Sequence, residues 1–166
     1  MKDEVKGQLE SLFAQDKQKT NMADQEKVEQ VAQAEKNDAE FLRIRDVVIV
    51  PAMREMADFI AAQGWGSDIS IEEGQTDSRG HKSPAKIALT FFRGSIPAYY
   101  SGHEYPYVWA VHSRGSAGVW FPTSTISPGR GGSSSSGTGA HLADVTVEMV
   151  QRHIVAVLSR VLKGLP

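Results

Sequence analysis

The chain contains no cysteine, and this absence excludes disulfide bonds and thiolate chemistry. A cysteine-free chain fits a reducing compartment, so we expect a cytoplasmic protein. The longest apolar run, from Val47 to Met53, falls far short of the roughly 20 residues that span a bilayer. The N-terminal residues mix acidic and basic side chains and hold no signal-peptide-like apolar segment. These absences predict a soluble protein with no membrane association.

The chain also lacks a large excess of charge of either sign. Its 18 basic and 20 acidic side chains leave a formal net charge of −2. Such a balance provides no overall field that would attract nucleic acid or an anionic membrane surface. The composition therefore predicts that neither nucleic acid nor a membrane is a partner.

Glycine and proline are scarce in the first third of the chain. Gly7 is the only glycine before Gly64, and Pro51 is the only proline before Pro84. Because both residues interrupt regular structure, the early part favours helices and the later part favours strands and turns. We expect an α+β protein with a polar helical extension over residues 1–38 and a single domain over residues 39–166.

The extension has few apolar residues to anchor it, and Thr20–Asn21 is predicted to interrupt its helix. A heptad repeat that starts at Val28 meets Glu35 and Asp38 at core positions, which argues against a long coiled coil. Two interpretations stay open at this point. The extension is either a solvated helix or frayed tail, or an arm that pairs with a second copy of the chain.

Two amphipathic helices are predicted beyond the extension. Residues 39–63 carry two adjacent apolar lines, so this helix is expected to pack on a sheet and on another helix at once. Pro51 either kinks it or begins a new helix, and Gly64 ends it. The second helix follows Thr146 as its N-cap, with Ile154 and Leu158 on its apolar stripe.

Four strands are predicted between these helices, over residues 68–72, 86–92, 107–112 and 119–121. Short turns between them favour an antiparallel meander, because parallel pairing needs a longer crossover. We expect the two helices to cover one face of this sheet. The other face retains apolar side chains, which either the N-terminal arm or another subunit must cover.

A glycine- and serine-rich run occupies residues 129–139, GRGGSSSSGTG. Convergent backbone N–H groups of such a run can bind an anion, but the spacing of a phosphate-binding loop and its lysine are missing. The composition favours a flexible loop, and an anion site remains the alternative.

Residues with catalytic chemistry are few and scattered. The five histidines show no spacing typical of a metal pair, and no nucleophile motif is present. His103 with Glu104, and His112 with Arg114, are the weak candidates for acid–base work, although a structural role is favoured for each. We expect no metal and no cofactor, and the pattern leans away from an enzyme.

Aromatic residues cluster near the predicted third and fourth strands. Such side chains dominate protein recognition surfaces, and the candidates for contact are Phe91, Tyr107, Trp109 and Trp120. The sequence favours a protein–protein interaction module that self-associates, as a homodimer, through an apolar sheet face or the N-terminal arm. The alternative is a small-molecule-binding protein or enzyme with a pocket at the loop-rich end of the sheet.

Overall fold

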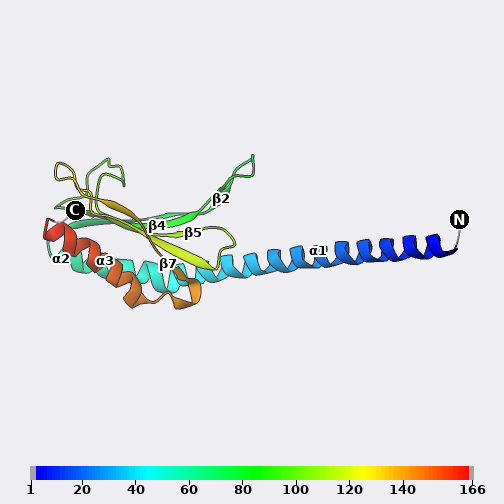
Figure 1. Cartoon of the computed structure of the whole chain (residues 1–166). Coiled ribbons are helices and arrows are strands. Elements are labelled where there is room, and N and C mark those ends of the chain that lie inside the picture. The colour runs from blue at the N-terminus through cyan, green and yellow to red at the C-terminus, as the bar shows by residue number, and fades with distance from the viewer. Residues whose placement is uncertain (1–2, 165–166) are drawn as a thin grey trace.

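The computed structural model describes residues 3–164 and confirms an α+β fold, with a five-stranded antiparallel main sheet and helices on one of its faces (Figure 1). The elements in chain order are α1 (Asp3–Ile44), the π-helical turn η1 (Arg45–Ile49), α2 (Val50–Ala62), β1 (Gly66–Glu72), β2 (Gln75–Thr76), β3 (Lys82–Ser83), β4 (Ala85–Phe92), β5 (Tyr107–His112), β6 (Gly118–Ser124), β7 (Ser134–His141), the 3-10 turn η2 (Leu142–Asp144) and α3 (Val147–Leu162).

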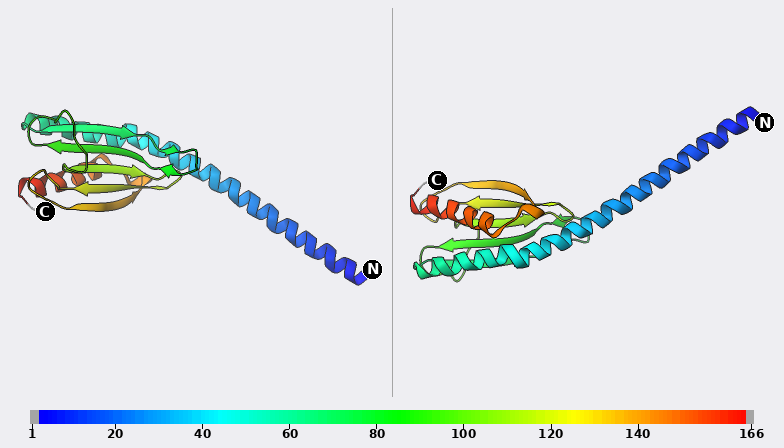
Figure 2. Two further views of the ribbon diagram at one scale, coloured as in Figure 1. Left: turned by 90° about the horizontal axis from the view of Figure 1, so that it is seen from above. Right: turned by 90° about the horizontal axis from the view of Figure 1, so that it is seen from below.

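Helix α1 is unbroken, so the predicted interruption at Thr20–Asn21 is wrong. The Thr20 hydroxyl donates a hydrogen bond to the backbone oxygen of Asp16 (3.0 Å), which satisfies this side chain inside the helix. Only the last turns of α1 meet the domain. The rest projects away from it as a single rod (Figure 2), and we call residues 3–33 the arm.

The α-helical geometry is interrupted just before Pro51, where the sequence predicted a kink or the start of a new helix. The π-helical turn η1 separates α1 from α2, and Pro51 lies in the first turn of α2. Its missing N–H and its ring disturb the preceding turn of the helix, and a π-helical turn lies there. Phe41 and Ile44 before this turn and Met53 after it are buried. The widened turn therefore joins two helices that both enter the same core.

The main sheet has five strands in the order β1-β4-β5-β6-β7, and every neighbouring pair is antiparallel. The expected meander of about four strands is present as β1, β4, β5 and β6. A separate two-stranded ribbon, β2–β3, extends beyond the main sheet between β1 and β4 (Figure 1).

The fifth strand, β7, comes from the run that was expected to be a flexible loop. Residues 134–139 pair with β6 instead, so the prediction of a loop over 129–139 is wrong for most of that run. Gly137 has φ +80°, and a Cβ atom there would overlap the backbone carbonyl of Phe121. The strand is held by backbone pairing, and its glycine permits a bulge that a side chain would block.

The core lies between the sheet and the helices α2 and α3. Ile87, Leu89 and Phe91 of β4 point into it. Helix α3 is capped by Thr146, whose Oγ1 accepts a hydrogen bond from Met149 N (3.2 Å), as the sequence predicted. Its buried side chains are Val150, Ile154, Val157 and Val161, whereas Leu158 is half-buried.

Candidate functional site

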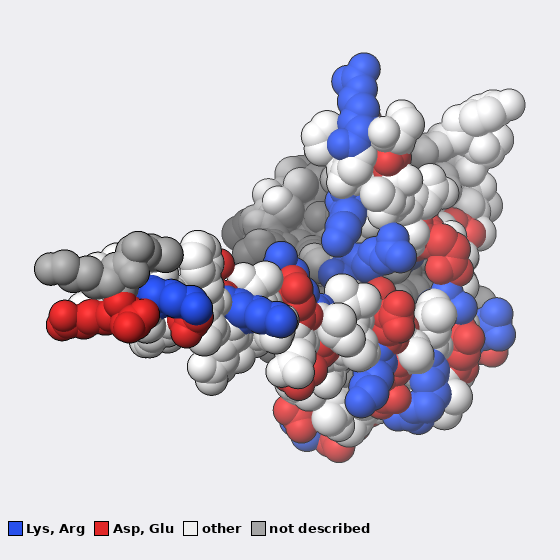
Figure 3. Space-filling view, turned by 90° about the vertical axis from the view of Figure 1, so that its right-hand side faces the viewer, with Lys and Arg blue, Asp and Glu red and all other residues white. Residues whose placement is uncertain are grey.

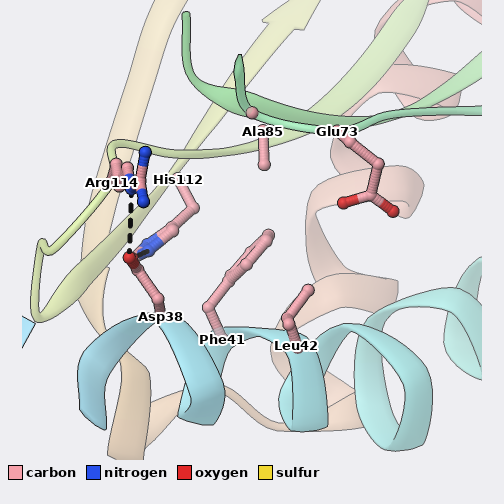
Figure 4. A pocket seen from close by; sticks show the side chains of 8 residues that line it. Asp38, Phe41, Leu42, Glu73, Ala85, His112 and Arg114 are labelled. Carbon is pink, nitrogen blue, oxygen red and sulfur yellow. Dashed lines mark hydrogen bonds and ion pairs between the residues drawn. The ribbon is translucent and has the colours of Figure 1, made fainter. Parts of the chain in front are cut away.

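A small cavity lies where α1 enters the domain. Its volume is about 270 Å³, and Figure 4 shows side chains from α1 below it and from β5 and the following turn above it. The lining residues are Asp38, Phe41, Leu42, Glu73, Gly74, Ala85, His112 and Arg114. We call this region the arm–domain junction.

His112 is the centre of the junction and is only 3% exposed. Its Nδ1 lies 3.0 Å from the backbone oxygen of Gly118, and its Nε2 lies 3.1 Å from Oδ1 of Asp38. Its ring also stacks on Phe41, with ring centres 4.2 Å apart. Both polar partners are oxygens, so each ring nitrogen can donate to the oxygen it faces when it carries the hydrogen.

Asp38 ties the arm to the turn that follows β5. Besides His112, it accepts a hydrogen bond from the backbone N–H of Gly115 (2.6 Å), and its other oxygen lies 3.7 Å from Nε of Arg114. Asn37 Nδ2 donates to the Gly115 oxygen (2.8 Å). These contacts fix the direction of α1, and they involve both ring nitrogens of His112.

The other two candidates for catalysis, His103 and Glu104, lie elsewhere. The His103 ring packs at 5.1 Å from the ring of Trp109, on the sheet face that points away from the helices. His112 points toward the helices from the same strand as Trp109, because side chains alternate along a strand. The structure therefore does not bring the two pairs of candidate residues together.

The segment from Arg93 to Pro106 covers part of this outer sheet face, which the sequence reasoning missed. Tyr100 Oη donates a hydrogen bond to Oδ2 of Asp68 (2.5 Å) on β1, and its ring packs edge-on against Phe92. Burial, together with the hydrogen bond and the negative charge of Asp68, raises the pKa of Tyr100 to about 12. Part of the outer face is thus covered by the chain itself, and the arm does not reach it.

The four aromatic residues proposed for contact have different surroundings. Phe91 is fully buried beneath the helices, so it belongs to the core. Tyr107 is also buried, stacked on Trp109 with ring centres 4.0 Å apart. Trp120 is 53% exposed, and its ring lies over Gly139 of β7, where a Cβ atom would touch it. Only Trp109 and Trp120 remain available on the outer face.

A shallow hollow of about 690 Å³ lies beside Trp109. The Lys86 ammonium sits 4.4 Å from the centre of a Trp109 ring and 2.7 Å from Oε1 of Glu72. Trp109 Nε1 is buried and has no hydrogen-bond partner among the described residues. We call the area formed by Lys86, Trp109, Val111, Trp120 and Pro122 the outer-face patch.

The arm carries the largest set of exposed apolar side chains in the described part of the chain. Phe13, for example, is 71% exposed. The others are Val5, Leu9, Leu12, Met22, Val28 and Val31. In the sequence, Val5, Leu9, Leu12 and Phe13 recur at helical spacing, but the length of helix that leaves them uncovered could not be read from it.

The distribution of charged side chains does not indicate a further binding site. Lys and Arg side chains lie among Asp and Glu side chains on the arm and on the domain beside it (Figure 3). Within residues 3–164, no group of three or more His, Asp or Glu side chains is arranged to hold a metal ion. None of the helices described over this range combines the length and the apolar character needed to cross a membrane.

No family model, curated protein or solved structure matches this chain. Function must therefore be argued from the geometry of the arm, the junction and the outer-face patch.

Proposed function

We propose that this chain is a cytoplasmic protein–protein interaction module that self-associates through its N-terminal arm. The observation that carries the proposal is the set of apolar side chains that the arm exposes between Val5 and Val31. Burying one such side chain stabilises an assembly by roughly 1.5 to 3 kcal/mol relative to leaving it in water. A helix that displays several of them is suited to bind another protein surface.

The energetics of isolated helices support the same conclusion. A helix in water gains little stability from propensity alone, and most helices in proteins depend on the packing of an apolar face. Helix α1 has such packing only near Phe41 and Ile44, which are buried against the domain. A surface from outside the chain would supply packing for the other turns.

The arm–domain junction gives the arm a fixed direction. Asp38 bonds to both His112 and Gly115, and the arm leaves the domain as a straight rod (Figure 2). Because the arm points away from its own sheet, its apolar residues face solvent or another molecule. The outer-face patch would serve as a second contact surface for a protein partner.

Light scattering on the full chain tests the proposal. We expect a dimer at micromolar concentration for the natural sequence, and a monomer for the double variant Leu12→Glu/Phe13→Glu, because two charges would have to be buried. The matched control is Gln18→Glu/Gln25→Glu, which adds the same charge on the opposite side of the helix and should remain a dimer. A natural chain that stays monomeric up to about 100 times that concentration would refute self-association.

A further inference from the structure

Six residues along one side of α1 follow a repeat of eleven. Leu9, Thr20 and Val31 are spaced eleven apart, and so are Leu12, Ala23 and Ala34. At about 100° per residue, all six fall within an arc of roughly 100° on α1. Eleven residues make three turns of about 3.67 residues, close to the natural helical period, so this stripe drifts around the helix by only about 20° per repeat.

The stripe continues into the part of α1 that contacts the domain. Asp38 and Phe41 fall in the same arc by the same geometry, and both face the arm–domain junction (Figure 4). The side of α1 that packs on the domain near Phe41 is therefore the same side that the arm exposes to solvent.

Two opposite charges interrupt the stripe. Asp16 and Lys27 are also eleven residues apart and lie in the same arc, and both side chains are exposed. Each would be costly to bury alone, so a partner for this face must supply a positive group opposite Asp16 and a negative group opposite Lys27.

We propose that the partner is the arm of a second copy of this chain, packed antiparallel with a two-fold axis between residues 21 and 22. This alignment, which rests on the self-association proposed above, places Asp16 of each copy opposite Lys27 of the other. The same axis places Leu12 opposite Val31 and Thr20 opposite Ala23. Two large apolar pairs then flank two ion pairs, with small side chains at the centre where the helices approach most closely.

A parallel pairing in register is disfavoured by the same charges. It would set Asp16 against Asp16 and Lys27 against Lys27, and like charges in a helix interface destabilise it. In the antiparallel arrangement both repulsions are replaced by attractions, because Asp16 of each helix then faces Lys27 of the other.

The domain limits the length of the shared interface. The turn that carries Gly115 already covers Ala34, whose Cβ lies 3.0 Å from where a Cβ on Gly115 would stand. The paired region therefore runs from Leu12 to Val31, about 30 Å at 1.5 Å per residue. Leu9 of the second copy then lies against this turn, so the domain sets the register of the pair.

Charge exchange provides the first test. We expect Asp16→Lys and Lys27→Asp each to weaken dimerisation at least tenfold in sedimentation equilibrium, because each places like charges opposite one another. The double variant should recover the natural affinity to within about threefold, since both ion pairs re-form with reversed sign. In a parallel pair the single changes would leave the affinity nearly unchanged, and that outcome would overturn the alignment.

Distances between spin labels provide the second test, and the absence of native cysteine makes labelling clean. Lys6→Cys and Lys19→Cys both place a label about 70° from the centre of the stripe. In the antiparallel pair, the two Lys6 labels are separated along the axis by about 47 Å and the two Lys19 labels by about 8 Å. Short distances at both positions would overturn the antiparallel register while leaving self-association standing, whereas a monomer would refute both.

Discussion

His112 Nε2 lies 3.1 Å from Oδ1 of Asp38, and this contact joins the end of strand β5 to helix α1 across 74 residues of sequence. The histidine is buried, while the aspartate is partly open to solvent. Because Asp38 also accepts the backbone N–H of Gly115, one carboxylate holds both the strand end and the following turn. The direction of the arm depends on this side chain.

We expect Asp38→Ala to destabilise the domain by about 2 to 4 kcal/mol, because it leaves polar groups of His112 and Gly115 without partners. Asp38→Asn should cost less, since its amide oxygen can still accept a hydrogen bond. Asp24→Ala on the exposed arm is the control, with a change within about 0.5 kcal/mol. Urea melts would measure all three, and equal stabilities for Asp38→Ala and Asp24→Ala would contradict a structural role for the junction.

The sequence predicted the elements whose signal is local. The two amphipathic helices and the strands β1, β4, β5 and β6 appear because apolar residues repeat at the period of each element. The sequence left two options for Pro51, a kink or the start of a new helix, because both follow from its ring and its missing N–H. The fold class is accordingly correct.

The features that the sequence did not reveal depend on backbone pairing, on contacts between residues far apart in the chain, or on a single local hydrogen bond. Strand β7 has no apolar alternation, because SSSGTGAH is held mainly by backbone pairing with β6. The Asp38–His112 contact joins residues that only the complete fold brings together. The unbroken helix through Thr20 reflects a local hydrogen bond to Asp16 that competes successfully with a turn.

Replacement of Gly137 tests the bulge in β7. Gly137→Ala should destabilise the domain by more than about 2 kcal/mol, because its positive φ is strained for alanine and the added Cβ overlaps the Phe121 carbonyl. Gly102 has open space around it and no positive φ, so Gly102→Ala is the control and should change stability little. Thermal melts compare the two, and equal midpoints would mean that β7 does not pair as described.

Two adjacent residues of α3 test which side of this helix packs into the core. Ile154 is fully buried, whereas Val155 is half exposed. Ile154→Ala should cost about 2 to 5 kcal/mol through lost burial and a residual cavity, and Val155→Ala should stay within about 0.5 kcal/mol. Denaturant unfolding of both variants checks which side of α3 faces the sheet, and a reversed order of the two costs would contradict the packing.

His153 should make stability depend on pH. Its ring stacks on Phe121, with ring centres 4.7 Å apart, and burial lowers its pKa below the ordinary value of 6.5. The unfolded chain therefore takes up a proton at this site before the folded chain does, so stability falls as the pH drops below about 6.5 and levels off below the folded-state pKa.

The measurement is the slope of unfolding free energy against pH for the natural chain and for His153→Gln. The variant should lose less stability between pH 7 and pH 5 than the natural chain, because its residue 153 does not titrate. The other ionisable groups are common to both chains, so the difference between the slopes isolates His153. Parallel slopes would show that its protonation is not coupled to folding.

Hydrogen exchange in the arm at several protein concentrations tests the central claim most directly. If a second copy covers the arm, the backbone amides of residues 12–31 should exchange more slowly as concentration rises, because an unpaired helix opens readily in water. The amides of α3 serve as the internal reference and should not change at low or high concentration. Fast exchange of residues 12–31 at every concentration would contradict the account, because no second copy would then cover the arm.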